Sequence, residues 1–417
     1  MTTKNNIQAD YKDSYVGVIP QEWEVKRIKD LGSVITGSTP PTADVSNYGS
    51  EYMFVSPADL SDNQKYVLST EKMLSYKGYA ISRKMPKGTI LYTCIGSTIG
   101  KIGIASRELT SNQQINAVIC NDKNEYLYYA LLLTTGRIKM LAGEQAVPII
   151  NKSEFENIKL AVPPMEEQRK IAEILGVWDE AIEKQSRLIE KLELRKRGLM
   201  QRLFAGRMRI HGFNTPWQKV KLGEIGTTYN GLTGKSKDDF ESGNAKFVPY
   251  INVFSNEKID INNLGCVKVD SGENQNKVKF GDIFFTVSSE TPDEVGMASV
   301  LLEDVGNTYL NSFCFGYRLN DFEVLNPVFA SYILRGDKFR KSIITLAQGS
   351  TRFNISKSEV MKLRIELPSL SEQKAIAEVL TVADNEIATH RKKLAALRLQ
   401  KCGLMQQLLT GKTRVKI

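Results

Sequence analysis

The chain has 417 residues, of which 41% are hydrophobic and 25% are charged. It is therefore long enough for two or more domains with cores of their own and too apolar for a disordered chain. The formal net charge of +9 allows a nucleic-acid or acidic partner. No stretch reaches the roughly 20 apolar residues of a membrane span, and the start lacks the build of a secretory signal, so we expect a soluble protein of the cytoplasm without a membrane partner.

The cysteines argue against a metal or disulfide framework. Five cysteines are scattered singly, without a C-x-x-C pair, and only two histidines could join them. Zinc sites and disulfide scaffolds both need clustered or regularly spaced ligands. We therefore expect no metal site, and we expect most of the cysteines to be small core residues.

Residues 1–165 combine strand-like runs with turn-rich loops. "GTILYTCI" at 88–95 has the β-branched and aromatic content of a strand, and "TGSTPPTADVSNYGS" at 36–50 is rich in turn formers. A helix is expected near "YLYYALLL" at 126–133. These features predict an α+β domain.

Residues 166–210 carry the periodicity of a long helix. Apolar residues step by three and four positions through Ile171, Leu175, Trp178 and Ile182, which places them on one stripe. Prolines at 163–164 precede the segment, and Gly206 near its end is a stop signal. Roughly 40 residues at 1.5 Å each give a helix about 60 Å long.

The same order then recurs in the second half. Residues 211–370 again read as a β-rich α+β domain, and residues 371–417 read as a second long helix. At an offset of 205 positions, residues 162–210 align without a gap onto residues 367–415. A repeat of this length indicates two copies of one unit, each with a variable domain and a shared helix.

The two helices are expected to pair as an antiparallel coiled coil, because a single long helix with a clean apolar stripe would not stay solvated. Two polar positions interrupt the stripe at equivalent places, Gln185 and His390. In an antiparallel pair they would face each other, and we predict that this polar layer sets the register of the helices. The alternative is that both side chains point outward.

The net charge is concentrated in the two helical segments. Residues 166–210 carry 11 basic and 8 acidic residues, and residues 371–417 carry 9 basic and 4 acidic residues. Basic residues near a helix C-terminus can simply complement the helix dipole. The alternative is a basic surface that faces a phosphate backbone.

Two segments resemble catalytic or nucleotide-binding motifs, but neither matches its motif fully. "GSTIGKI" at 96–102 is one residue short of a phosphate-binding loop and has Ile102 in place of the hydroxyl residue. "NPVF" at 326–329 has Val328 where the motif of amino-methyltransferases needs proline, and no glycine-rich cofactor motif accompanies it. We expect neither catalytic nor cofactor-binding residues in this chain.

The repeated segments resemble a known family. "PPMEEQRKIAEIL" at 163–175 returns as "LPSLSEQKAIAEVL" at 367–380, and "GLMQ" stands near both helix ends, at 198–201 and 403–406. Together with "PQEWEVKRIKDLG" at 20–32, this doubled pattern is similar to the specificity (S) subunit of type I restriction-modification systems. The second opening departs slightly, since Trp217 follows a proline directly.

The resemblance implies a fold and a function. It implies two target recognition domains in tandem pseudo-twofold repeat, separated by two antiparallel coiled-coil helices. Each domain would read one half of a bipartite double-stranded DNA target, and the helices would set the spacer. It also implies two docked methyltransferase subunits, with restriction subunits outside them, and S-adenosylmethionine as a cofactor of the partner methyltransferase rather than of this chain.

Candidate base-reading residues are the polar residues of the variable loops. Arginine and lysine suit guanine, asparagine and glutamine suit adenine, and serine and threonine suit either. The alternative for each is an ordinary solvated loop residue. The candidates are Ser38, Thr39, Lys101, Gln113, Gln114 and Gln145 in the first domain, and Thr233, Lys235, Thr351, Arg352 and Asn354 in the second.

Two other classes of function stay open at this point. A self-contained DNA-modifying enzyme with degenerate motifs would show activity as the purified chain alone. A scaffold that binds only proteins would show no sequence-selective DNA binding even with its partners present.

Overall fold

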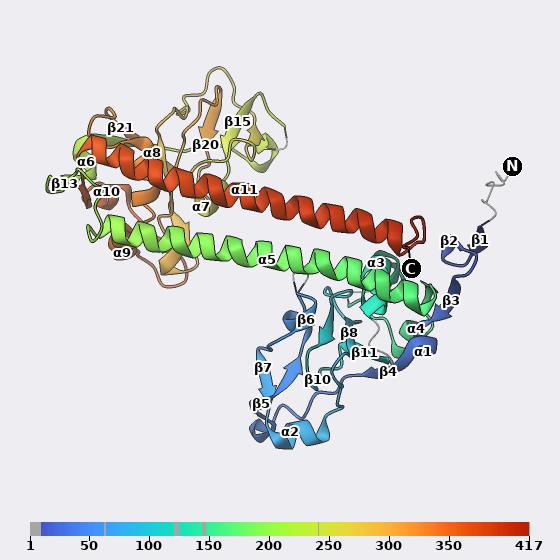
Figure 1. Ribbon diagram of the computed structural model, residues 1–417. Helices are drawn as coiled ribbons and strands as arrows, with labels where there is room; N and C mark the ends of the chain where they lie inside the picture. The colour runs from blue at the N-terminus through green and yellow to red at the C-terminus, as the bar shows by residue number, and fades with distance from the viewer. Residues whose placement is uncertain (1–9, 62–63, 121–124, 144–146, 241, 417) are drawn as a thin grey trace. The chain divides into compact units, whose positions relative to one another are not determined.

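The computed structural model describes residues 10–61, 64–120, 125–143, 147–240 and 242–416 (Figure 1). The chain forms two compact units, one made of Met1–Ile189 and His390–Ile417, the other of Glu190–Thr389. The long helices α5 (Met165–Phe204) and α11 (Leu370–Leu408) each contribute one part to either unit. Each unit is therefore one β-rich domain with segments of both helices.

The first unit holds the elements that precede α5. Its helices other than α5 and α11 are α1 (Ile28–Leu31), α2 (Tyr76–Ile81), α3 (Glu125–Leu141) and α4 (Lys152–Glu156). Its strands are β1 (Tyr11–Ser14), β2 (Gly17–Pro20), β3 (Glu24–Arg27), β4 (Gly32–Thr36), β5 (Tyr48–Val55), β6 (Tyr66–Val67), β7 (Lys72–Leu74), β8 (Ile90–Thr93), β9 (Ile102–Ala105), β10 (Thr110–Ser111), β11 (Ile115–Cys120) and β12 (Lys159–Val162).

The second unit holds the elements between the two long helices. Its own helices are α6 (Leu222–Ile225), α7 (Tyr250–Ser255), α8 (Pro327–Ile333), α9 (Asp337–Ile344) and α10 (Lys357–Val360). Its strands are β13 (Gln218–Lys221), β14 (Gly226–Asn230), β15 (Ala245–Val248), β16 (Gly265–Val267), β17 (Ile283–Thr286), β18 (Ser288–Ser289), β19 (Ala298–Val300), β20 (Thr308–Leu310), β21 (Cys314–Leu319), β22 (Phe353–Asn354) and β23 (Arg364–Leu367).

The sheets of the two domains have the same topology. The order β4-β11-β8-β9-β6 in the first domain corresponds to β14-β21-β17-β19 in the second. The three-stranded sheets β10-β5-β7 and β20-β15-β16 also match, and in both the first pair is parallel and the second antiparallel. The repeat seen in the sequence is therefore a repeat of fold, even where the sequences of the domain interiors no longer align.

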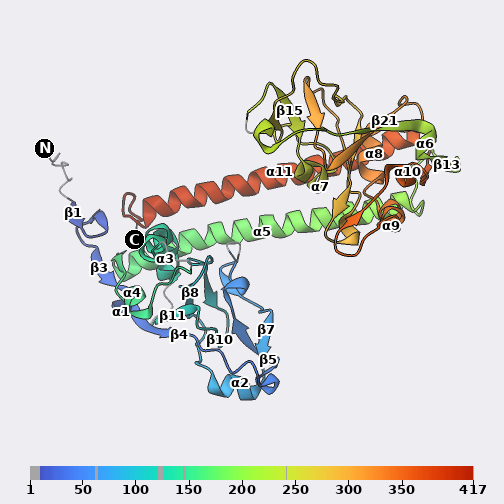
Figure 2. The same ribbon diagram turned by 180° about the vertical axis from the view of Figure 1, so that it is seen from behind.

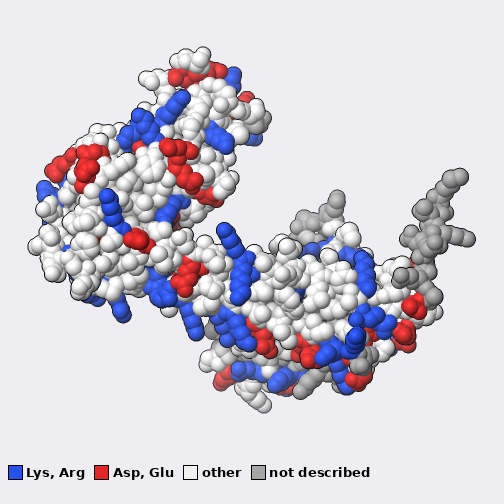
Figure 3. All heavy atoms as spheres, turned by 45° about the horizontal axis from the view of Figure 1, so that its top comes forward, with Lys and Arg blue, Asp and Glu red and all other residues white. Residues whose placement is uncertain are grey.

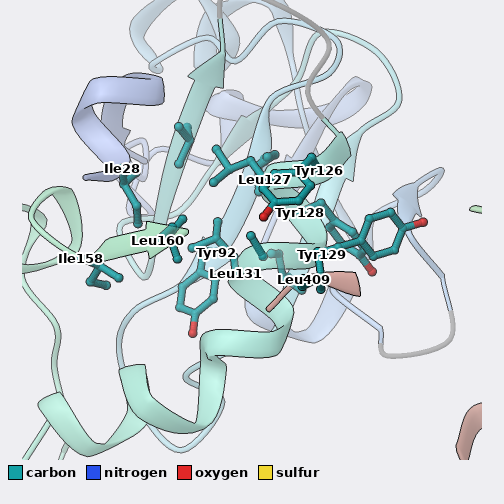
Figure 4. Close-up of a cluster of buried hydrophobic side chains, with 14 of the residues drawn as sticks. Ile28, Tyr92, Tyr126, Leu127, Tyr128, Tyr129, Leu131, Ile158, Leu160 and Leu409 are labelled. Atoms are coloured by element: carbon teal, nitrogen blue, oxygen red, sulfur yellow. The ribbon is translucent and has the colours of Figure 1, made fainter. Parts of the chain in front are cut away.

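Both long helices complete the core of each domain. In the first unit, buried Tyr126 and Tyr129 of α3 belong to the same cluster as Ile171 of α5 and Leu409 beyond the end of α11 (Figure 4). In the second unit, Tyr332 of α8 joins a cluster with side chains from α5 and α11. Each fully buried side chain of this size contributes about 1.5–3 kcal/mol. The apolar stripes of the helices are thus used largely against the domains.

The helices lie side by side and run antiparallel in both units (Figures 1 and 2). In the first unit Asp179 contacts Lys401 and Gln185 contacts His390, so numbers rise along one helix as they fall along the other. In the second unit Lys196 contacts Asp384 in the same sense. The helices contain 40 and 39 residues, close to the lengths expected from the periodicity.

None of the helices within the described residues is long and apolar enough to cross a membrane.

Candidate nucleic-acid interface

A close approach of two backbones builds the loop face of the first domain. Gly37, at the end of β4, donates its N–H to the carbonyl of Ile115 at 2.9 Å, and Ser38 donates to Ser111 at 2.9 Å. A Cβ on Gly37 would lie 2.1 Å from the carbonyl oxygen of Asn112, so a larger residue cannot occupy this position. The glycine therefore brings the loop after β4 onto the loop before β11.

The glutamines of the second loop lie on this face. Exposed Thr39 donates a hydrogen bond to the side chain of exposed Gln113. The backbone of half-buried Gln114 accepts from Cys94 at 2.8 Å, and its side chain accepts from Asn112 at 2.9 Å. Four of the predicted residues, Ser38, Thr39, Gln113 and Gln114, are thus brought together.

The two other predicted residues of the first domain are Lys101 and Gln145. Lys101 is half-buried, and its ammonium donates to the carbonyl of Pro57 at 3.1 Å. Gln145 lies outside the described residues. The neighbouring segment is placed by Gly96, which donates its N–H to Pro148 at 2.9 Å and so joins the loop after β8 to the loop that precedes α4.

The second domain repeats the same loop arrangement with different side chains. A Cβ on Gly231 would lie 2.1 Å from the carbonyl oxygen of Asn311, as at Gly37. Thr233 is exposed, and its N–H donates to the side chain of Gln275 at 3.1 Å. Lys235 is paired with Glu273 at 2.5 Å and its side chain is only 6% exposed, so in this arrangement its ammonium is directed into the domain.

A tight hairpin presents the other predicted residues of the second domain. Gln348 and Asn354 exchange backbone hydrogen bonds of 2.9 and 2.8 Å. Gly349 has φ of 130°, a conformation that favours glycine, and a Cβ there would lie 2.1 Å from the carbonyl of Arg352. Thr351, Arg352 and Asn354 are all exposed, and among the described residues the Arg352 guanidinium has no ion-pair partner.

An exposed aromatic residue beside this hairpin escaped the sequence interpretation. Ile355 donates its N–H to the carbonyl of Val287, and Val287 donates to that of Phe313, both at 3.0 Å. Phe313 is 57% exposed and stands where Gln114 stands in the first domain, since Cys94 donates to Gln114 in the same way. The domain interiors do not align, so no signal in the sequence marked it.

The charged side chains do not gather into one basic face in the view of Figure 3. Lysine and arginine lie interspersed with aspartate and glutamate over the atoms it shows. A contact with nucleic acid is therefore argued from the loops rather than from bulk charge. Among the described residues, no group of histidine, cysteine, aspartate or glutamate could hold a metal ion.

Buried glutamates tie the helix starts to the helix ends. Glu167 of α5 is fully buried and accepts hydrogen bonds from Arg414 at 2.7 and 3.0 Å and from the Trp23 indole at 3.0 Å. In the second unit Arg209 donates to fully buried Glu372 at 2.6 and 2.7 Å. The glutamates and the arginines are both related by the offset of 205 positions. Sequence reasoning missed these ion pairs, although the same glutamate and the same arginine at equivalent positions of the two repeats could have marked them.

Ion pairs in the second unit keep their charges across neutral pH. Burial disfavours the charge on Asp384, but hydrogen bonds from Lys196 and Tyr332 outweigh it and hold the pKa of Asp384 below its ordinary value. Burial lowers the pKa of Lys196. The neighbouring carboxylates of Glu257 and Asp384 raise it more strongly, so the pKa of Lys196 lies above its ordinary value. The stabilisation by Asp384 is lost only as the pH falls through its folded pKa in acid, and that by Lys196 only as the pH rises through its folded pKa in alkali.

The polar pair in the helix stripe lies within the first unit. Gln185 Nε2 is 2.7 Å from His390 Nδ1 and donates to the His390 carbonyl at 3.0 Å. Gln185 is buried, whereas His390 is half-buried. The two side chains therefore face each other, and their role in the register stays a prediction.

Replacing both residues of this layer by leucine is expected to keep the free energy of unfolding unchanged or to raise it, because apolar side chains replace both partners of a polar pair and leave neither unsatisfied. The same variant should loosen the spacing of the two domains, since an apolar layer no longer distinguishes one register from a shifted one. Urea unfolding measures the first effect, and the range of spacer lengths accepted in a DNA target measures the second. An unchanged spacer preference would contradict the register role.

A large groove lies within the first unit between its domain and the two helices. Its volume is about 1440 Å³, and it is lined among others by Lys65, Tyr128, Val177, Lys401 and Cys402. Domain, α5 and α11 all contribute to its walls.

Comparison with known proteins identifies the family. The model of the family described as "Type I restriction modification DNA specificity domain" matches the chain twice, over residues 20–194 and 214–399. The chain belongs to this family. The two matches fall on the two halves of the repeat, so this specificity subunit carries two such domains in tandem.

Relatives and solved structures agree with this membership. The MjaVIII specificity subunit of Methanocaldococcus jannaschii is 28% identical over 98% of this chain and 97% of its own length. The HindI specificity subunit of Haemophilus influenzae is 34% identical over 36% of this chain and 33% of its own length. The S subunit of M. genitalium has the same fold, with a TM-score of 0.55 at 16% identity over 98% of both chains.

Proposed function

We propose that this specificity subunit reads a bipartite target in double-stranded DNA, with one half-site recognised by each domain. The observation that carries the proposal is the pair of equivalent loop faces with different side chains. The glycines at 37 and 231 build the same backbone approach, while Gln114 of the first face is replaced by Phe313 of the second. One scaffold with two sets of side chains is what reading two different short sequences requires.

The chemistry of the loops suits readout of base edges. Gln113 and Gln114 offer amides, which pair in a bidentate manner with adenine, and Arg352 offers a guanidinium that matches guanine. Hydroxyl groups such as those of Thr39 and Thr351 can contact base edges or phosphates. Hydrogen bonds hold the side chains of Thr39, Gln113 and Gln114 in place before DNA arrives, so less conformational entropy is lost on binding.

The two helices would set the distance between the half-sites. A helix of 40 residues is about 60 Å long, which is enough to span half-sites one DNA turn of about 34 Å apart. We propose that catalysis belongs to partner subunits rather than to this chain. Two methyltransferase subunits, which would bring S-adenosylmethionine, would dock against the helices, and restriction subunits would join outside them.

An exposed apolar pair on the helices marks the proposed docking surface. Val177 and Leu399 are 63% and 75% exposed in the first unit, and their repeat equivalents Val382 and Leu194 are 62% and 65% exposed in the second. A single exposed apolar residue needs no explanation, but the same exposed pair in both copies of the repeat indicates a binding surface. Two copies of one partner would cover two equivalent surfaces.

Leu399→Asp is expected to remove one of two methyltransferase subunits from the complex, because a carboxylate in an apolar contact is desolvated without a partner. Size-exclusion chromatography with light scattering would show a 1:1 complex in place of 2:1. Leu194→Asp should have the same effect at the other surface, and the two together should abolish assembly. Lys392→Asp, at an exposed polar position of α11, is the control and should leave the stoichiometry unchanged.

The function as a whole is tested by modification-sensitive sequencing of genomic DNA with and without this gene. We expect a methylated motif of two parts with a fixed gap that disappears on deletion. The experiment also names both half-sites and the spacer. An unchanged methylome in cells that express the whole system would contradict the proposal.

A further inference from the structure

Each unit contains a half-buried polar cluster that joins its domain to both long helices. In the first unit the hydroxyl of Tyr129, on α3, donates to Asp179 Oδ2 of α5 at 2.5 Å. Lys401 of α11 lies 2.5 Å from Asp179 Oδ1 and 5.3 Å from the centre of the Tyr129 ring. One carboxylate is thus shared by a residue of the domain and a residue of the opposite helix.

The second unit repeats this cluster with the roles of the helices exchanged. Tyr332 of α8 donates to Asp384 Oδ2 of α11 at 2.5 Å. Lys196 of α5 lies 2.7 Å from Asp384 Oδ1 and 5.2 Å from the centre of the Tyr332 ring. Both the aspartates and the lysines are separated by 205 positions, so the same device occurs once in each copy of the repeat.

A lysine from the sheet region closes each cluster from the domain side. Lys65 is 3.2 Å from the Tyr129 hydroxyl, and its side chain is only 9% exposed. Lys258 is 2.6 Å from the Tyr332 hydroxyl and 3.1 Å from Asp384 Oδ2. Both tyrosines are fully buried. The clusters therefore lie between domain and helices, where the side chains of Asp179 and Asp384 are only 22% and 27% exposed.

Polar clusters of this kind define geometry more than they add stability. Apolar contacts between a domain and two helices are non-directional, so they do not specify which polar groups must meet. A half-buried carboxylate with directional partners on two different elements favours one arrangement, because another arrangement leaves a charge or a buried hydroxyl unpaired.

We propose that Asp179 and Asp384 are positioning residues that hold each reading domain in one orientation on the helices, so that the target is read with one spacer length. The inference rests on the proposed function, since spacer selectivity has meaning only for a bipartite target. It assigns to these clusters a specificity role that is separate from the base-reading loops.

The test compares DNA targets with the native spacer and with spacers one base pair shorter or longer. The full chain in complex with its methyltransferase is titrated with each target, using the half-sites from the methylome. For Asp179→Asn, we expect the preference for the native spacer to fall about tenfold, because Asn is isosteric but presents an amide or a neutral oxygen to Lys401. The preference for each base within the half-sites should not change. Asp384→Asn should act alike, and the double variant should show a larger loss.

Matched variants separate positioning from folding. Tyr129→Phe keeps the buried ring and removes only the hydroxyl, so it decides the question if the aspartate variants do not fold. Lys401→Arg keeps the charge and should retain most of the spacer preference, whereas Lys401→Met should lose it. Lys184→Met removes an exposed pair with Glu180 on α5, where the lysine side chain is 77% exposed, and should change nothing.

The outcomes distinguish this inference from the function on which it rests. If the wild-type complex does not discriminate between spacers or binds no specific DNA, the proposed function itself is contradicted. If the wild type discriminates and Asp179→Asn and Tyr129→Phe discriminate equally well, the positioning role is overturned. A variant that weakens binding to all spacers by the same factor also overturns it, because that result shows a structural role only.

Discussion

Arg209→Ala is expected to lower the free energy of unfolding clearly more than removal of an exposed ion pair does, because it takes away the charge that pairs with a buried carboxylate. Arg209 donates two hydrogen bonds to the carboxylate of Glu372, which is fully buried. Without the guanidinium, a carboxylate remains in the interior without a compensating charge. The nearby Trp217 does not replace it, because among the described residues its indole nitrogen has no hydrogen-bond partner.

Arg414→Ala tests the same junction in the first unit and should have a smaller effect. Glu167 there would keep the hydrogen bond from Trp23 at 3.0 Å, which partly satisfies the carboxylate. Urea unfolding of the full chain, followed by circular dichroism and by tryptophan fluorescence, measures both variants, and two probes are used because the chain need not unfold in one step. Arg169→Ala is the matched control, since its pair with Glu166 is exposed and is worth less than about 1 kcal/mol. If Arg209→Ala were as mild as this control, the buried pair would not stabilise the junction.

Arg352→Ala is expected to weaken binding to the target by about 1–3 kcal/mol, which corresponds to roughly five- to 150-fold in affinity. The guanidinium is exposed on a rigid hairpin and is not paired within the described protein, so it is available for DNA. We expect it to contact a guanine in the half-site read by the second domain. The loss should therefore be confined to targets that carry that guanine, and selectivity at this one position should be relaxed.

Competition binding with single-base variants of each half-site measures this effect. If Arg352 contacted a phosphate instead, its loss would weaken binding to all sequences alike. The slope of log affinity against log salt concentration would also fall by about one. Arg364→Ala, at an exposed position of β23 in the same domain, serves as the control and should leave binding unchanged. Uniform weakening by Arg352→Ala would contradict base reading at this residue.

The sequence already determined the large features of this protein. Local periodicity predicted helices close to those observed at Met165–Phe204 and Leu370–Leu408, because a repeated apolar stripe is a property of neighbouring residues. The internal repeat predicted two domains of the same class, and the sheets share one topology. The resemblance in the repeated segments pointed to the family that the comparison then showed.

Features that depend on distant residues were decided only by the tertiary structure. Lys235 was predicted to face DNA, and the fold pairs it with Glu273, 38 positions away. Phe313 became a candidate only when the strands placed it where Gln114 stands in the other domain. The partners of Asp179 lie 50 and 222 positions away, on two other elements. Helices form from local spacing and could be predicted, whereas loop faces and shared carboxylates arise from packing between elements far apart in the chain, which no local pattern encodes.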